Sequence, residues 1–149
     1  MSAREEILHL MNRYVFTFDT GDCNAFAQLF EHGEWVVEGT PSHMGKQGAL
    51  DMLANIKLYA DGTPKTKHLM SNVDLRIDET VGTASSECYV TVLQQTPDFP
   101  LQTIFCGHYF DDFERVGDDW RFTKRVIRSP LVGDLSAHVK ELSSVVAED

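Results

Sequence analysis

The stretch that decides the fold is Thr66-Lys67-His68-Leu69-Met70-Ser71-Asn72, which opens a long segment of alternating apolar and polar residues. It follows Gly62-Thr63-Pro64, where glycine and proline interrupt regular secondary structure. Beyond it, the apolar positions continue with Val73, Leu75 and Ile77. Such alternation is typical of a β-strand with one buried face. We therefore predict a strand that runs to Asp78, with His68 near its start, where a side chain can reach the mouth of a cavity.

His68 is a candidate general base, because histidine is the side chain whose charge changes closest to neutral pH. A catalytic histidine usually needs a carboxylate that fixes its tautomer and stabilises its cation. Asp19, at the predicted end of the first helix, is the best candidate for that partner. From the residues alone, the preferred interpretation is that Asp19 is a helix cap and His68 a strand histidine with a structural role.

The residues before this strand predict helices and one short strand. Ser2 and Glu5 have the spacing of a capping box, which predicts the start of a long amphipathic helix ending at Asp19. Asp22 is the predicted cap of a second helix that runs to Phe30. A strand over Glu34–Glu38 and a helix over Gly45–Tyr59 complete this half.

The residues after it predict a meander of strands with short connections. The expected segments are a strand over Val81–Leu93, a loop over Gln94–Pro100, strands over Leu101–Arg115 and Trp120–Ile127, and a loop and short helix or tail over Leu131–Val146. Segregated helices and antiparallel strands indicate an α+β fold. We expect one domain, residues 1–149, in which a curved sheet and the helices across one face enclose a pocket.

Composition excludes several classes of function. The chain has 149 residues and a formal net charge of −10, which argues against binding nucleic acid or an anionic membrane. Three cysteines without a Cys-x-x-Cys spacing argue against a disulfide framework or a zinc knuckle. The six histidines lack metal-binding spacing and no glycine-rich phosphate loop follows a strand, so we expect no metal and no cofactor. Without a signal-peptide core or a long apolar run, a cytoplasmic location is expected.

Several segments together resemble the SnoaL-like branch of the NTF2-like superfamily, over roughly Ile7 to Ser129. In chain order they are Arg13-Tyr14 with Asp19-x-Gly21-Asp22, Phe30 through Trp35, Gly45-x-x-Gly48-Ala49, Thr66-Lys67-His68 with Asn72, Gly107-x-Tyr109-x-Asp111 through Arg115, Trp120-Arg121, and Arg125. The resemblance implies a cone-shaped fold, with a curved mixed or antiparallel sheet and N-terminal helices. This fold hosts lyases, isomerases, hydrolases and non-enzymes, so it does not define a reaction.

Within the superfamily, the pairing of Asp19 with His68 is similar to that of scytalone dehydratase and hexachlorocyclohexane dehydrochlorinase, in which an Asp–His pair removes a proton during an elimination. The sequence departs from both enzymes. Tyr14 stands where the dehydrochlorinase has a lysine, and Phe18 where the scytalone enzyme has a tyrosine. Arg125 matches an arginine of the dehydrochlorinase. The resemblance therefore implies the base without the complete leaving-group machinery.

Further site residues are predicted with alternatives. Tyr14 could polarise a substrate oxygen or belong to the core. Arg125 could hold an anionic group or form a structural bridge with Glu87 or Asp111, and we slightly prefer the bridge. Gly107 could leave room for a ligand or mark a bend in the sheet, and Asn72 could line the pocket or tie down backbone beside His68. The complete predicted pocket lining is Phe18, Trp35, Asn72, Tyr89, Phe105, Gly107 and Tyr109.

The sequence thus predicts a cofactor-independent lyase of the dehydratase or dehydrohalogenase kind, acting on a small apolar or aromatic substrate. His68 is the base, Asp19 orients it, and Tyr14 or Arg125 assists the leaving group. The alternatives are a SnoaL-type polyketide cyclase, an isomerase like ketosteroid isomerase, and a non-catalytic ligand-binding domain. A homodimer or homotrimer is expected.

Overall fold

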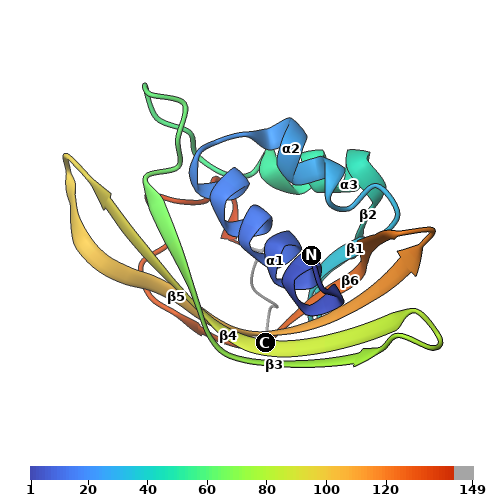
Figure 1. The fold of residues 1–149 in the computed structure, drawn as a ribbon. Helices are drawn as coiled ribbons and strands as arrows, with labels where there is room; N and C mark the ends of the chain where they lie inside the picture. Colours follow the sequence, from blue (N-terminus) through green and yellow to red (C-terminus); the bar gives the residue numbers. More distant parts are fainter. Residues whose placement is uncertain (143–149) are drawn as a thin grey trace.

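The computed structural model describes residues 1–142, which form helices packed on one side of a curved sheet (Figure 1). None of the helices in this part of the chain is both long enough and apolar enough to span a membrane. The elements in chain order are α1 (Ala3–Asp19), α2 (Cys23–Gln28), β1 (Glu34–Val37), β2 (His43–Met44), α3 (Gly45–Leu53), β3 (Thr66–Asp78), β4 (Thr83–Thr96), β5 (Phe99–Val116) and β6 (Asp119–Val132).

The sheet has the strand order β2-β1-β6-β5-β4-β3. The strands from β3 to β6 form the predicted antiparallel meander, and β1 joins it by pairing in parallel with β6. Figure 1 shows the long strands bending around α1, with α2 and α3 on the same concave side. The predicted α+β fold, with a curved sheet and N-terminal helices, is therefore confirmed.

Helix α1 begins and ends through specific local contacts. Ser2 and Glu5 form the predicted capping box, with the Ser2 hydroxyl accepting from Glu5 N–H and the Glu5 carboxylate accepting from Ser2 N–H. At the other end, Gly21 has a φ of +75° and the N–H groups of Gly21 and Asp22 donate to the carbonyls of Phe18 and Thr17. This is a Schellman motif, which ends the helix sharply just after Asp19.

Three predicted boundaries are wrong, and the first of them is decided by contacts distant in sequence. The third helix ends at Leu53 rather than Tyr59, since Ile56 forms a β-bridge with Val139 and Lys57 N–H donates to the carbonyl of His138. The loop predicted over Gln94–Pro100 is a tight hairpin, with Thr96 opposite Phe99. The predicted tail begins as strand, because β6 extends to Val132, and its residues 143–146 lie outside the described part of the chain.

The Schellman glycine offers a test of how Asp19 is positioned. A Cβ on Gly21 would lie 1.9 Å from the carbonyl oxygen of Gly62, whereas a Cβ on Gly62 (φ +82°) would meet nothing within 4 Å. Gly62→Ala should cost about 1–2 kcal/mol of unfolding free energy through the left-handed backbone alone. Gly21→Ala should lose about 1–3 kcal/mol more, because backbone must shift. Urea unfolding of both variants checks this, and equal losses would show that the contact is unimportant.

Candidate active site

The site is built around the carboxylate of Asp19, which accepts three hydrogen bonds from the first residues of β3. Nδ1 of His68 lies 2.6 Å from Oδ1, and Thr66 Oγ1 donates to the same oxygen at 2.7 Å. The backbone N–H of His68 donates to Oδ2 at 2.7 Å. The structure therefore brings together the two residues that the sequence singled out, from the end of a helix and the start of a strand.

The place of β3 in the sheet explains why its backbone can bind a side chain. Within residues 1–142, β3 is the edge strand of the sheet and pairs only with β4, so N–H groups on its other edge have no strand to bond. Unpaired backbone donors that are buried are costly. Asp19 supplies the missing acceptor at His68, and it also fixes α1 against this edge.

The electrostatics of the pair favour an ionised Asp19. Burial raises the pKa of this carboxyl, since only 8% of the residue is exposed, but the hydrogen bonds from His68 and Thr66 outweigh burial and leave the pKa below its ordinary value. An ionised Asp19 accepts the Nδ1 proton of His68, and this selects the tautomer whose Nε2 has a free lone pair. Within residues 1–142, Nε2 has no hydrogen-bond partner, so it is available to take a proton.

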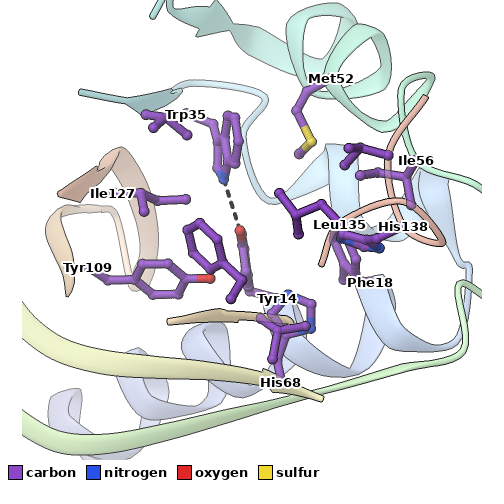
Figure 2. A pocket seen from close by; sticks show the side chains of 14 residues that line it. Tyr14, Phe18, Trp35, Met52, Ile56, His68, Tyr109, Ile127, Leu135 and His138 are labelled. Atoms are coloured by element: carbon purple, nitrogen blue, oxygen red, sulfur yellow. Dashed lines mark hydrogen bonds between the residues drawn. The ribbon is translucent and has the colours of Figure 1, made fainter. Parts of the chain in front are cut away.

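His68 is part of the wall of a cavity of about 60 Å³ between the helices and the sheet (Figure 2). Most of the wall is apolar or aromatic. Its residues are Tyr14, Phe18, Trp35, Val37, Met52, Ile56, His68, Val92, Phe105, Tyr109, Ile127, Leu135, His138 and Val139. A base in such surroundings suits a small, largely apolar ligand, because apolar side chains contact most of the ligand and a few polar groups can fix its orientation.

Two tyrosines bring hydroxyl groups to this cavity. The indole N–H of Trp35 donates to the Tyr14 hydroxyl at 2.9 Å, as the dashed line in Figure 2 shows. Tyr14 keeps its own O–H to donate to a ligand. Burial raises the pKa of both phenols, so both stay neutral at ordinary pH. These groups can act as hydrogen-bond donors to an oxygen or a departing group.

Arg125 lies behind the tyrosines and is not among the cavity-lining residues of the described chain. It is fully buried, and its Nε and Nη2 donate to the two oxygens of Asp111 at 2.6 and 2.8 Å. Its guanidinium carbon lies 4.2 Å from the ring centre of Tyr14 and 4.1 Å from that of Tyr109. Of the two roles considered for Arg125, the geometry gives the structural bridge with Asp111.

Three of the predicted pocket residues do not line the cavity. Asn72 is exposed, with a φ of +57°, where the pairing of β3 with β4 shifts register. Tyr89 is half exposed on the outer face of β4, because Cys88 and Val90 on either side of it point inward. Gly107 is buried behind the wall, where a Cβ would lie 3.0 Å from Phe105 and 3.1 Å from Ile127. Gly107 thus makes room for two wall residues rather than for a ligand.

The sequence interpretation missed the wall residues that follow β6. Leu135, His138 and Val139 come from a segment with no periodic pattern, so nothing local indicated their position. The available signal was indirect: it was His138 itself, because a histidine is unusual among the apolar residues of a cavity wall. Among residues 1–142, no three His, Cys, Asp or Glu side chains are grouped as a metal ion would require.

Comparison with known proteins relates this chain to a sequence family and to solved structures of the same fold. The sequence model described as a SnoaL-like domain matches residues 1–126. A solved NTF2-like protein with a cystatin-like fold, from Novosphingobium aromaticivorans, is 25% identical with a TM-score of 0.70, over 83% of this chain and 79% of that chain. No protein with a curated description matches the chain by sequence.

Two further solved structures show the same fold at lower identity. Hexachlorocyclohexane dehydrochlorinase LinA-type3 from Novosphingobium barchaimii is 24% identical, with a TM-score of 0.68 over 89% of this chain and 92% of that chain. Aln2 from a Streptomyces species is 18% identical, with a TM-score of 0.67 over 86% and 92%. At these identities the likeness shows the fold alone.

The Asp19 hydrogen bonds predict a dependence of stability on pH. Because the folded-state pKa of Asp19 is below its ordinary value of 3.8, its stabilisation is complete above that value and is lost as pH falls through the folded pKa. At pH 7, Asp19→Asn should lower the unfolding free energy by roughly 2–3 kcal/mol, the size of hydrogen bonds to a charged group. Urea unfolding of both proteins at several pH values should show this gap closing below pH ~4. A gap that persists at acid pH would show that the carboxylate charge contributes nothing.

The buried ion pair makes a second prediction. Arg125→Leu should lower the unfolding free energy by about 3–5 kcal/mol, because the Asp111 carboxylate is left buried without a partner. Removing both charges, in Arg125→Leu with Asp111→Leu, should recover part of this loss. Arg121→Leu, which breaks the half-exposed pair with Glu114, is the control and should cost about 0–1 kcal/mol. An Arg125→Leu protein with unchanged stability would contradict the structural role.

Proposed function

Because the chain belongs to the SnoaL-like domain family, we propose that it is a cofactor-independent lyase in which His68 removes a proton from a small, largely apolar substrate. The observation that carries this proposal is the 2.6 Å contact between His68 Nδ1 and Asp19 Oδ1, on the wall of an apolar cavity. Asp19 is the positioning residue that holds His68 in the tautomer of a base.

The proposed step is an elimination. Nε2 of His68 takes a proton from a carbon of the substrate, the electrons of the broken C–H bond form a C=C bond, and a hydroxyl or halide leaves the neighbouring carbon. A halide departs as an anion, whereas a hydroxyl takes up a proton and departs as water. The imidazolium formed on His68 is stabilised by the ionised Asp19 until the proton is returned to the leaving hydroxyl or to solvent.

Tyr14 is the proposed donor to the departing group. Its hydroxyl already accepts the N–H of Trp35, which orients it, and its own proton remains available. Arg125 is proposed to assist only indirectly, because it stacks on Tyr14 and Tyr109 and pairs with Asp111. A positive charge behind the two phenols makes their protons better donors to an oxygen or halide in the cavity.

The similarity to a hexachlorocyclohexane dehydrochlorinase supports elimination over other reactions of the family, although at 24% identity it establishes the fold only. Proton removal next to a carbonyl would equally begin a cyclisation or a double-bond shift, as in a polyketide cyclase or a ketosteroid isomerase. The rival from outside catalysis is a ligand-binding domain in which the Asp–His pair braces α1 against β3.

A homodimer or homotrimer is part of the proposal. The outer face of the sheet, away from the helices, carries the half-exposed Tyr89 and the partly exposed His108, whose rings pack edge to face at 5.0 Å. Exposed aromatic side chains of this kind are common at interfaces between protein chains.

The base can be tested with two probes that separate the reactions. Chloride release from hexachlorocyclohexane reports elimination, and deuterium exchange at the α-carbon of cyclohexanone, followed by proton NMR, reports proton removal alone. His68→Asn keeps an N–H that can donate to Asp19 but has no base. It should lower either rate at least ~100-fold, the usual contribution of a general base.

The matched control is His9→Asn, which removes an exposed histidine of α1 and should leave both rates unchanged. Thermal unfolding of each variant accompanies the rates. If His68→Asn turns over either probe as fast as the wild type, or if its only effect is a lower melting temperature, the pair is structural and the lyase proposal fails.

A further inference from the structure

A second histidine, His138, lies on the cavity wall near His68 and has no role in the proposed step. In Figure 2 its side chain stands beside Phe18 and Leu135, and its ring centre lies 5.8 Å from that of Phe18. It belongs to the segment 135–139, which follows the sheet and closes one side of the cavity.

The backbone around His138 is held by hydrogen bonds from other segments of the chain. Lys57 N–H donates to the His138 carbonyl at 2.8 Å, and Gln94 Nε2 donates to the Ala137 carbonyl at 3.0 Å. The Tyr59 hydroxyl donates to the same carbonyl, and Lys57 Nζ donates to that of Ser136 at 2.7 Å. These contacts fix the main chain, and none of them involves the imidazole.

The imidazole is buried and unsatisfied. His138 is 8% exposed, and its Nδ1 has no hydrogen-bond partner within the described residues. A buried polar atom left without a partner typically destabilises a protein, so such an atom in a native structure calls for an explanation. The ring as a whole forms part of the cavity wall, so a ligand in the cavity lies beside the imidazole.

The two histidines differ in what faces them. His68 is bonded to the Asp19 carboxylate, whereas the ionisable groups that act on His138 are His68 and Asp19, neither of which is hydrogen-bonded to it. Burial lowers the pKa of His138 to about 4; the neighbouring His68 acts in the same direction and Asp19 opposes it. His138 is therefore a neutral ring at ordinary pH, with one N–H and one lone pair to offer a ligand.

We propose that His138 binds the polar atom of the ligand, so that the cavity selects molecules that carry a hydroxyl or carbonyl oxygen on an otherwise apolar ring. The cavity wall supplies the contacts for the apolar part, and the neutral imidazole supplies one hydrogen bond, which orients the ligand relative to His68. This inference rests on the proposed function in one respect, namely that the same cavity takes the substrate.

Phenol and toluene are the probes, because they have nearly the same shape and differ by one hydroxyl that can both donate and accept. Their dissociation constants for the wild-type protein are measured by ligand-observed NMR. Phenol should bind more tightly than toluene, and His138→Leu should reduce this preference roughly fivefold to tenfold, the size of one neutral hydrogen bond. His138→Asn, which keeps a polar atom near the position of Nδ1, should retain part of the preference.

A second readout does not depend on variants. In nitrogen-edited NMR spectra of the wild-type protein, phenol should shift the ring nitrogens of His138, whereas toluene should shift them little. If the phenol preference is the same in His138→Leu as in the wild type, or if phenol leaves the His138 nitrogens unchanged, the inference is overturned.

The outcome is separable from that of the lyase test, because binding needs no turnover. A phenol preference that depends on His138, in a protein whose His68→Asn variant is as fast as the wild type, would support the binding role and reject the lyase. Loss of proton exchange in His68→Asn, together with a phenol preference that ignores His138, would reject only this inference.

Discussion

The carboxylate of Asp19 is the point on which the fold and the candidate site both depend. It accepts hydrogen bonds from a backbone N–H, a hydroxyl and an imidazole N–H of β3, and so joins the end of α1 to this edge strand of the sheet. The same contacts that stabilise the packing of α1 also select the tautomer of His68. The carboxylate that fixes α1 therefore also orients His68. A change at Asp19 affects both stability and rate, so the two must be measured together.

The buried Arg125–Asp111 pair has a comparable double effect on the other side of the cavity. Charges this deeply buried stabilise a protein little in themselves, because desolvation opposes their attraction. Their position has consequences, however. The guanidinium stacks on the rings of Tyr14 and Tyr109, so it fixes the two phenols whose hydroxyls face the cavity. The polar chemistry of the wall is thus supported from behind by a residue that does not reach the cavity.

Local patterns in the sequence predicted the parts of this structure that local forces decide. The capping box at Ser2, the stripe that ends at Asp19 and the alternation after His68 each reflect contacts between near neighbours, and together they predicted the α+β class. The pairing of Asp19 with His68 was predicted from the resemblance to the SnoaL-like family. Tyr89 was misplaced although its neighbours Cys88 and Val90 carried the correct alternation. Asn72 was misplaced because a register shift in a strand pair is set by both strands. The early end of α3 and the position of His138 depend on contacts between residues far apart in the sequence, which no local window contains.

The segment that holds Leu135, His138 and Val139 has a consequence for how the cavity comes into being. All strands of the sheet and all three helices precede this segment in the order of synthesis within the described chain. The Asp19–His68 contacts are made by α1 and β3 alone, so this segment completes the wall without contributing to the pair. Variation confined to these few residues would reshape the chamber without disturbing the scaffold, so this is where evolution, or a designer, can change the ligand most easily while keeping the base.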